Sequence, residues 1–147
     1  MIKGLLKGDY PVSMRIYLSL GANLGEREAT INKALDLLEQ QVGPLIKRSS
    51  FFYSKPWGFE STHDFCNLCA SFETTLSPLD LLYVTQSVEK QLGRNEKSIN
   101  NVYHDRVIDI DILLYGDMTI STPELTIPHP KMEERDFVQV PLAEIMH

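Results

Sequence analysis

The sequence predicts an α+β fold in which an antiparallel sheet has helices packed on one face. Two segments place apolar residues at the three- and four-residue spacing of an amphipathic helix. Apolar runs with strand-like composition lie before, between and after these two segments. The order is βαββαβ with additions, and 147 residues with 43% hydrophobic content suffice for one domain with a substantial core.

The first half of the chain predicts three strands and one helix. The helix begins near Glu26, carries one apolar stripe and stops at Gly43-Pro44. Before it, the glycines of Gly21-Ala22-Asn23-Leu24-Gly25 permit a tight turn. The connection between the second and third strands is too long for a tight hairpin. The stripe consists of Ile31, Ala34, Leu35 and Leu38. The expected strands are 15–20, 45–53 and 65–74.

The second half begins with a well-marked helix. Ser77 is its expected N-cap, Pro78 takes the first helical position, and Gly93 follows its end. A polar, aperiodic loop then leads to a strand that ends at Tyr115. Further apolar pieces are expected at 120–127 and 137–145. This order favours a ferredoxin-like sandwich with long loops beside its site, at 57–64 and 95–104.

Charge and hydropathy exclude several classes of protein. The net charge of -6 argues against nonspecific nucleic-acid binding, which depends on cationic surface. No apolar stretch is long enough to cross a bilayer, and the start of the chain does not resemble a secretory signal, so a cytoplasmic protein without membrane contacts is expected. A monomer is favoured and a dimer stays open. Because Met14 directly precedes the first strand, we divide the chain into an N-terminal extension of unknown role, 1–13, and a single domain, 14–147.

Cys66 and Cys69 form a C-x-x-C pair, a pattern that elsewhere marks zinc or redox sites. Here the pair lies in a strand-like run, where positions three apart face opposite sides of the sheet. No second Cys or His pair completes a zinc site. Packing as reduced thiols is therefore the favoured interpretation.

The most informative pattern is Asp109-Ile110-Asp111 within an apolar run. Alternation along a strand places both carboxylates on one face and Ile110 on the other. Two like charges on a hydrophobic strand resist desolvation unless a cation relieves their repulsion. A magnesium site that also engages phosphates meets this need, and a solvated strand face is the alternative.

Several motifs occur together in an order that resembles one known family. These motifs are Ser19-Leu20-Gly21-Ala22-Asn23-Leu24-Gly25, Pro56-Trp57-Gly58, Asp64-Phe65-Cys66-Asn67, Gln86 with Glu89, Gly93-Arg94, Asp105 to Asp111, and Pro128-His129-Pro130. From Arg15 to Ile145 the chain is similar to 6-hydroxymethyl-7,8-dihydropterin pyrophosphokinases of folate biosynthesis. The resemblance implies a ferredoxin-like enzyme that transfers the β,γ-pyrophosphoryl group of ATP to the hydroxymethyl group of a reduced pterin and releases AMP.

The resemblance also implies which residues hold the nucleotide. Asp109 and Asp111 would bind two Mg²⁺ ions that bridge the triphosphate. Arginine forks match phosphate oxygens, and His129 is held in a stiff segment between two prolines. For His129 a purely structural role stays open, as does a solvated helix position for Glu89. The implied catalytic residues are Arg94, Arg106, Asp109, Asp111, His129 and Arg135. The implied ATP-binding residues are Glu89, Arg94, Lys97, Arg106, Ile110, His129 and Arg135.

A pterin pocket needs aromatic walls and a hydrogen-bonding edge. Asn67 can donate and accept on such an edge. By resemblance, Phe137 is the closer match to a stacking residue, although Phe65 and Phe137 are also plausible core residues. Trp57 either closes over the substrate or anchors its loop. The implied pterin-binding residues are Ser54, Trp57, Phe65, Asn67 and Phe137.

Two functions from other classes stay open at this point. Ferredoxin-like domains also serve as ligand-binding regulatory modules without chemistry. Paired strand aspartates also occur in magnesium-dependent nucleotidyl transferases, which release pyrophosphate instead of AMP. Identification of the nucleotide product distinguishes these two functions from pyrophosphoryl transfer.

Overall fold

The computed structural model describes residues 9–55, 64–93 and 107–146. Five strands form one antiparallel sheet in the order β2-β4-β1-β5, with β3 also paired to β4. The strands are β1 (Asp9–Ala22), β2 (Leu45–Arg48), β3 (Phe52–Ser54), β4 (Phe65–Leu76) and β5 (Asp109–Tyr115). The α+β prediction is confirmed.

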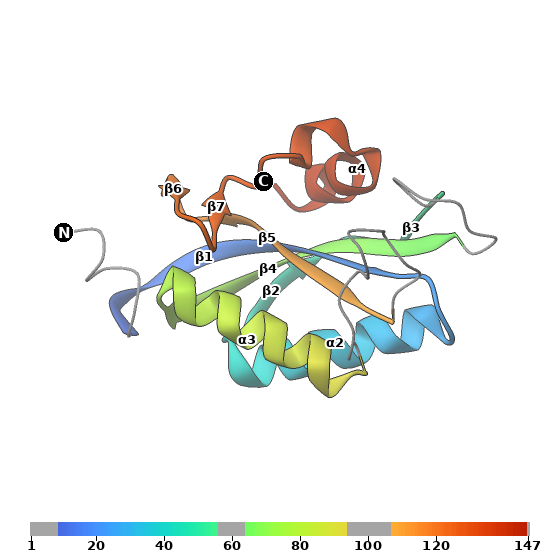
Figure 1. Ribbon diagram of the computed structural model, residues 1–147, viewed down its shortest axis with the longest axis horizontal. Helices are drawn as coiled ribbons and strands as arrows, with labels where there is room; N and C mark the ends of the chain where they lie inside the picture. The colour runs from blue at the N-terminus through green and yellow to red at the C-terminus, as the bar shows by residue number, and fades with distance from the viewer. Residues whose placement is uncertain (1–8, 56–63, 94–106, 147) are drawn as a thin grey trace.

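Helices cover both faces of this sheet (Figure 1). The helices α2 (Arg27–Gln41) and α3 (Pro78–Gln91) lie on one face, as the sequence predicts. The helix α4 (Asp136–Ile145) packs on the other, so the expectation of helices on one face alone is incomplete. Apolar spacing in 137–145 is too short to distinguish a helix from a strand, which explains the omission.

The helix boundaries follow their sequence signals. The Ser77 hydroxyl accepts a hydrogen bond from the Asp80 amide at 3.3 Å, and Gly93 ends α3 with a φ of 104°. After α2, Gly43 has a φ of 151°, and a Cβ at this position would lie 1.9 Å from the carbonyl oxygen of Glu73. Only glycine therefore permits the chain to turn this closely against β4.

Some strands differ from expectation in their limits. The predicted strand 45–53 is divided into β2 and β3 after Arg48. The Ser49 amide still donates to the Cys69 carbonyl at 2.9 Å, but the Cys69 amide donates to the Ser49 hydroxyl at 3.0 Å instead of to a backbone carbonyl. The predicted piece 120–127 is a small hairpin of β6 (Ile120–Ser121) and β7 (Thr126–Ile127). A short 3₁₀ turn, Met132–Glu134, precedes α4. The strand β1 begins at Asp9, so the division placed after residue 13 falls inside a strand.

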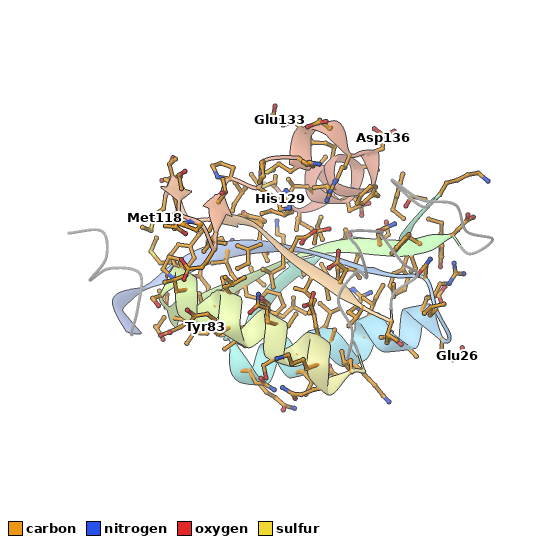
Figure 2. The ribbon with its side chains drawn as sticks, viewed as in Figure 1. Glu26, Tyr83, Met118, His129, Glu133 and Asp136 are labelled. Carbon is orange, nitrogen blue, oxygen red and sulfur yellow. The ribbon has the colours of Figure 1, made fainter. Side chains whose placement is uncertain are left out.

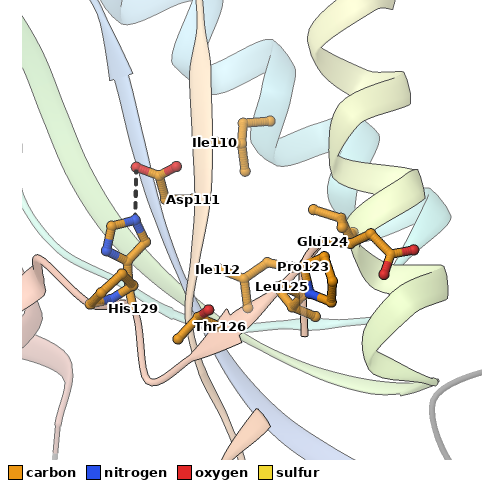
Figure 3. A pocket seen from close by; sticks show the side chains of 10 residues that line it. Ile110, Asp111, Ile112, Pro123, Glu124, Leu125, Thr126 and His129 are labelled. Atoms are coloured by element: carbon orange, nitrogen blue, oxygen red, sulfur yellow. Dashed lines mark ion pairs between the residues drawn. The ribbon is translucent and has the colours of Figure 1, made fainter. Parts of the chain in front are cut away.

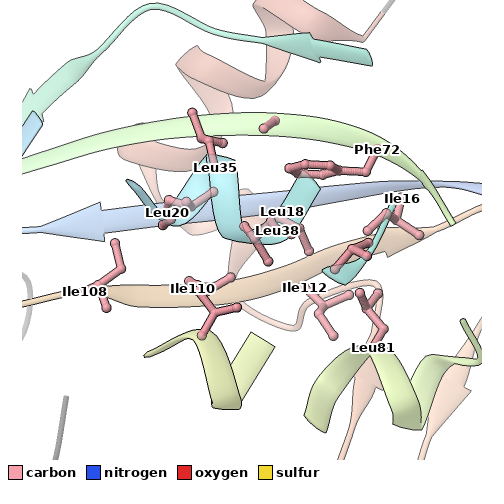
Figure 4. Close-up of a cluster of buried hydrophobic side chains, with 14 of the residues drawn as sticks. Ile16, Leu18, Leu20, Leu35, Leu38, Phe72, Leu81, Ile108, Ile110 and Ile112 are labelled. Carbon is pink, nitrogen blue, oxygen red and sulfur yellow. The ribbon is translucent and has the colours of Figure 1, made fainter. Parts of the chain in front are cut away.

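The main hydrophobic core lies between the sheet and the α2–α3 layer (Figure 4). Alternate residues of β1 and β5, among them Leu18, Leu20, Ile110 and Ile112, enter it. A smaller cluster lies beneath α4 and consists of Cys69, Leu113, Val138, Leu142 and Ile145. No helix within the described ranges is long and apolar enough to cross a membrane.

Candidate active site

The predicted alternation along β5 is confirmed. Ile110 and Ile112 are 6% and 4% exposed and face the main core, whereas Asp109 and Asp111 are only partly buried. Asp109 lies opposite Gly21, and Asp111 lies opposite Ser19 on β1. A register shift then occurs at Leu113, which is skipped in the pairing and joins the cluster beneath α4. The acidic pair and the α4 cluster thus share one face of the sheet.

Two cationic or basic side chains reach Asp111 from the segment that follows β7. The Oδ2 atom of Asp111 lies 3.9 Å from Nε2 of His129 and 3.7 Å from a guanidinium nitrogen of Arg135. Figure 2 shows His129 in the layer between β5 and α4. Both distances are longer than a hydrogen bond allows, so His129 and Arg135 interact with the Asp111 carboxylate electrostatically and not through hydrogen bonds to this atom. The structure therefore brings Asp109, Asp111, His129 and Arg135 into one cluster.

The orientation of His129 is set by its backbone and its own ring. Its amide donates to the Leu113 carbonyl at 3.0 Å, and its Nδ1 accepts a hydrogen bond from the Lys131 amide at 3.1 Å. In the neutral ring the proton is then on Nε2, the atom nearest Asp111. Burial, with Arg135 and Lys131, lowers the pKa of His129 against the opposing effect of Asp109. His129 is therefore a neutral Nε2–H donor at neutral pH.

Arg135 lies at the start of α4, where the chain turns from the 3₁₀ segment into the helix. Its side chain is 14% exposed, and its guanidinium carbon lies 5.5 Å from the centre of the Phe137 ring. This distance is typical of a cation–π contact. Arg135, a predicted phosphate ligand, and Phe137, a predicted pterin contact, therefore hold each other's side chains in position.

A second group of predicted residues lies on the same face of the sheet, across β1 from the aspartates. The Asn67 side chain, 3% exposed, donates to the Phe52 carbonyl at 3.0 Å and to the Ser54 hydroxyl at 2.9 Å. Gly21 separates Asn67 on β4 from Asp109 on β5. A Cβ on Gly21 would lie 2.9 Å from Oδ1 of Asn67 and 3.6 Å from the Phe65 ring. Because Gly21 has no side chain, the surface between Asn67 and Asp109 is left uncovered at this position.

Glu89 connects the α3 layer to the acidic strand. It is 9% exposed, and its Oε2 accepts a hydrogen bond from the Ile110 amide at 2.7 Å. Because β5 is an edge strand, this amide points away from β1 and requires another partner. Glu89 therefore supports the segment between Asp109 and Asp111, and the alternative of a solvated helix position is wrong.

A cavity of about 270 Å³ opens beside Asp111 and His129 (Figure 3). It lies between β5, the β6–β7 hairpin and α3. Sequence reasoning did not identify the hairpin as a wall, because 120–127 offers no motif beyond its extended character. The lining residues are Leu82, Ile110, Asp111, Ile112, Pro123, Glu124, Leu125, Thr126, His129 and Pro130.

The two cysteines face opposite sides of β4, as predicted. Cys66 belongs to the main core and Cys69 to the cluster beneath α4. Burial raises the pKa of the Cys66 thiol to about 11 and that of Cys69 to about 12. Both are free thiols, and protonated buried thiols are poor nucleophiles and poor metal ligands.

Among the described residues, Asp109 and Asp111 would need further ligands to complete the coordination of a metal ion. Within residues 9–55, 64–93 and 107–146, no three His, Cys, Asp or Glu side chains are grouped around a common metal position. Two carboxylates with room for phosphate oxygens and water are nevertheless typical of Mg²⁺ bound together with a nucleotide. The predicted residues Trp57, Arg94, Lys97 and Arg106, and most of the two predicted long loops, lie outside the described residues.

Comparison with known proteins identifies the family. A model of the 7,8-dihydro-6-hydroxymethylpterin-pyrophosphokinase family matches residues 17–147. The 2-amino-4-hydroxy-6-hydroxymethyldihydropteridine pyrophosphokinase of Porphyromonas gingivalis is 48% identical over 131 residues, which cover 88% of this chain and 89% of that protein. The protein of the same name from Aquifex aeolicus is 44% identical over 130 residues, covering 88% of this chain and 79% of that protein.

Solved structures show the same fold. A Plasmodium falciparum HPPK-DHPS triple mutant matches 96% of this chain and 41% of its own with a TM-score of 0.75 and 16% identity. A second HPPK-DHPS crystal structure, in complex with substrates, matches 91% of this chain and 40% of its own with a TM-score of 0.74 and 16% identity. Together with the arrangement of the acidic pair, the family match and the sequence identities show that this chain belongs to the 7,8-dihydro-6-hydroxymethylpterin-pyrophosphokinase family.

Proposed function

We propose that this chain transfers the β,γ-pyrophosphoryl group of ATP to 6-hydroxymethyl-7,8-dihydropterin and releases AMP, as a Mg²⁺-dependent step of folate biosynthesis. Family membership supports the reaction. The observation that carries the proposal in this chain is the position of the acidic pair. Asp109 and Asp111 lie between the cavity on one side and the surface over Gly21, bordered by Asn67, on the other. A phosphoryl-transfer site needs such a centre between its two substrates.

The cavity beside Asp111 is the proposed nucleotide site. Ile112 and Leu125 give it apolar walls suited to a base, and Asp111 and His129 lie at its border. A nucleotide in this cavity would extend its phosphates towards the acidic pair and Arg135. Arg94, Lys97 and Arg106 are proposed as further phosphate ligands on the basis of the family pattern.

Asp109 and Asp111 are the residues that would hold two Mg²⁺ ions. When bound, the ions would neutralise charge on the triphosphate and polarise its oxygens. The residues fit this role because two carboxylates leave coordination positions for phosphate oxygens. The Ile110 amide, held by Glu89, fixes the strand between the two ligands.

The chemistry is an in-line displacement at the β-phosphorus. The pterin hydroxymethyl oxygen forms a bond to that phosphorus and loses its proton to solvent, while the bond to the oxygen bridging the α- and β-phosphates breaks. That oxygen leaves with AMP, and the pterin carries the pyrophosphoryl group. Negative charge grows on the equatorial and leaving oxygens, where the Nε2–H of His129 and the guanidinium of Arg135 can donate.

The pterin is proposed to lie over Gly21, between Asn67 and Asp109. These two residues are two strands apart, or about 10 Å at the usual spacing, which accommodates a bicyclic ring. Oδ1 of Asn67 is turned towards the space above Gly21, where it can accept from the pterin edge. Ser54, Phe65, Phe137 and Trp57 are proposed as the remaining pterin contacts.

One assay tests the proposed function against its alternatives. The chain is incubated with ATP, Mg²⁺ and 6-hydroxymethyl-7,8-dihydropterin, and the nucleotide product is identified by chromatography. AMP formation that requires the pterin is the expected result. Pyrophosphate release would favour a nucleotidyl transferase, and pterin binding without turnover would favour a regulatory module; either result contradicts the proposal.

A further inference from the structure

Three side chains join the first turn of α2 to the two strands that carry the predicted pterin residues. The Tyr53 hydroxyl on β3 donates a hydrogen bond of 2.6 Å to Oε2 of Glu28. The Arg27 guanidinium donates to the Asp64 carbonyl at 2.7 Å, directly before β4. The same guanidinium lies 5.4 Å from the centre of the Tyr53 ring. We call Arg27, Glu28 and Tyr53 the α2–β3 cluster.

The cluster holds positions directly beside the predicted pterin residues. Tyr53 precedes Ser54, and Asp64 precedes Phe65. Ser54 and Phe65 are themselves paired across the β3–β4 ladder. Because side chains alternate along a strand, Tyr53 points towards α2 while Ser54 points to the opposite face, where it accepts from Asn67. The cluster therefore fixes the backbone from the face that is remote from the substrate.

The strand β3 is held by few backbone hydrogen bonds, although the Asn67 side chain donates to its Phe52 carbonyl and α4 packs against it. It consists of three residues and is hydrogen-bonded to β4 alone within the described sheet. Strands this short are marginal without side-chain contacts. Figure 1 shows β3 at the end of the sheet where α2 begins. The hydrogen bond of Tyr53 to Glu28 thus adds an anchor, from the α2 side, to the strand that places the Ser54 hydroxyl beside Asn67.

The protonation states of the cluster suit a stable anchor near neutral pH. The hydrogen bond to Glu28 raises the pKa of Tyr53 to about 12, so its hydroxyl stays a donor. The hydrogen bond from Tyr53 lowers the pKa of Glu28, so its carboxylate stays an acceptor. Arg27 supplies the positive charge beside this pair.

We propose that Arg27, Glu28 and Tyr53 are positioning residues for the pterin substrate. By tying the first turn of α2 to β3 and to the start of β4, they hold Ser54 and Asn67 in the geometry that binds the pterin, without touching it. This inference rests on the proposed function. It assigns a substrate-specific effect to three surface residues that lie apart from the acidic pair and the nucleotide cavity.

The test separates pterin binding from nucleotide binding. Tyr53→Phe removes the hydroxyl but keeps the ring under Arg27, and we expect a rise of about three- to tenfold in the KM and Kd for pterin. The KM for ATP, kcat and the melting temperature should stay at parent values. Tyr83→Phe is the matched control, since Tyr83 is 48% exposed against 49% for Tyr53 and lies on α3 (Figure 2).

A pair of Glu28 variants sharpens the test. Glu28→Gln retains an oxygen that accepts from Tyr53 and should behave like the parent, whereas Glu28→Ala should reproduce Tyr53→Phe. Combining Glu28→Ala with Tyr53→Phe should add little, because both remove the same hydrogen bond. An unchanged pterin KM and Kd in Tyr53→Phe would overturn the proposal, as would equal losses for both substrates with a lower melting temperature.

Isothermal titration with pterin and a nonhydrolysable ATP analogue gives the Kd independently of turnover. A parent chain that binds pterin but forms no AMP refutes the proposed function alone, and one that binds no pterin refutes both.

Discussion

At the scale of single residues, the site depends on side chains whose positions are set by the sheet. Asp109 and Asp111 face one way because a strand alternates, and Gly21 keeps the surface between Asp109 and Asn67 low. His129 faces Asp111 because its amide is bonded to Leu113 of the same strand. The chemistry of each group follows from these fixed neighbours.

Replacement of Asp111 by alanine should abolish most of the activity while the fold remains. It removes a proposed metal ligand and the partner of His129 and Arg135, so we expect kcat to fall at least about 100-fold. Relief of the repulsion between the two carboxylates should offset the lost attraction to Arg135, so the melting temperature should change little in the absence of metal. Steady-state assays with melting curves test this. Ser121→Ala, on the exposed part of the hairpin, serves as a control. Turnover of Asp111→Ala within a few-fold of the parent would remove Asp111 from the mechanism.

A methyl group at Gly21 should interfere with the pterin in particular. In Gly21→Ala the new Cβ lies 2.9 Å from Oδ1 of Asn67, closer than a real Cβ contact allows, so the amide must move. We expect a higher KM for pterin, by about tenfold or more, and a nearly unchanged KM for ATP. Two-substrate kinetics measure both constants. Parallel increases in the two KM values would mean that the variant disturbs the whole site and not the surface beside Asn67.

At the scale of elements, α4 is the layer that completes the site. Its start carries Arg135 and Phe137, and its last turn is tied to the β2–β3 connection by Glu144. The Glu144 carboxylate accepts hydrogen bonds from the amide and the hydroxyl of Ser50, at 2.9 and 3.0 Å. The helix is thus anchored at one end while the other end presents site residues.

The anchor of α4 predicts a pH dependence of stability. The hydrogen bonds from the Ser50 amide and hydroxyl lower the pKa of Glu144 in the folded chain. A depressed pKa gives a contribution that is present above the unfolded value of 4.5 and is lost as the pH falls through the lower folded value. Urea unfolding of the parent and Glu144→Gln at pH 7 and pH 3.5 tests this. The difference in unfolding free energy between the two proteins should shrink at the lower pH, and a difference that grows would contradict the assignment.

At the scale of the whole molecule, the sheet separates a large core from a smaller one. The core beneath α2 and α3 contains Cys66, and the cluster beneath α4 contains Cys69. Each layer therefore has its own buried thiol. Both thiols have raised pKa values and are shielded from reagents in the folded state.

The two thiols should report separately on the two layers. Leu142→Ala leaves a cavity beneath α4, at a cost of about 2–4 kcal/mol, and should accelerate the modification of Cys69 by a thiol reagent more than that of Cys66. Leu81→Ala, in the main core, is the matched control and should favour Cys66. Labelling followed by mass spectrometry of peptides gives the two rates. Equal acceleration of both thiols by Leu142→Ala would mean that the layers open together.

The sequence predicted much of this molecule because local signals decide much of it. The alternation around Ile110, the Ser77 cap and the opposite faces of Cys66 and Cys69 all follow from rules that operate within a few residues. The second helical layer and the hairpin wall were not predicted, because short apolar runs fit either a helix or a strand until packing selects one. The contacts of Glu89 and Tyr53 join positions far apart in the chain, and neither spacing nor composition identifies such partners.

The separation of the two layers has a practical consequence for handling the protein. The acidic pair lies on the α4 face, whereas most of the buried apolar side chains lie on the other face. A preparation in which α4 has detached would keep most of its circular dichroism signal and still lack the positions of Arg135 and Phe137. Spectroscopic helicity is therefore a poor criterion of sample quality for this enzyme, and the fraction of competent molecules has to be counted by titrating substrate sites.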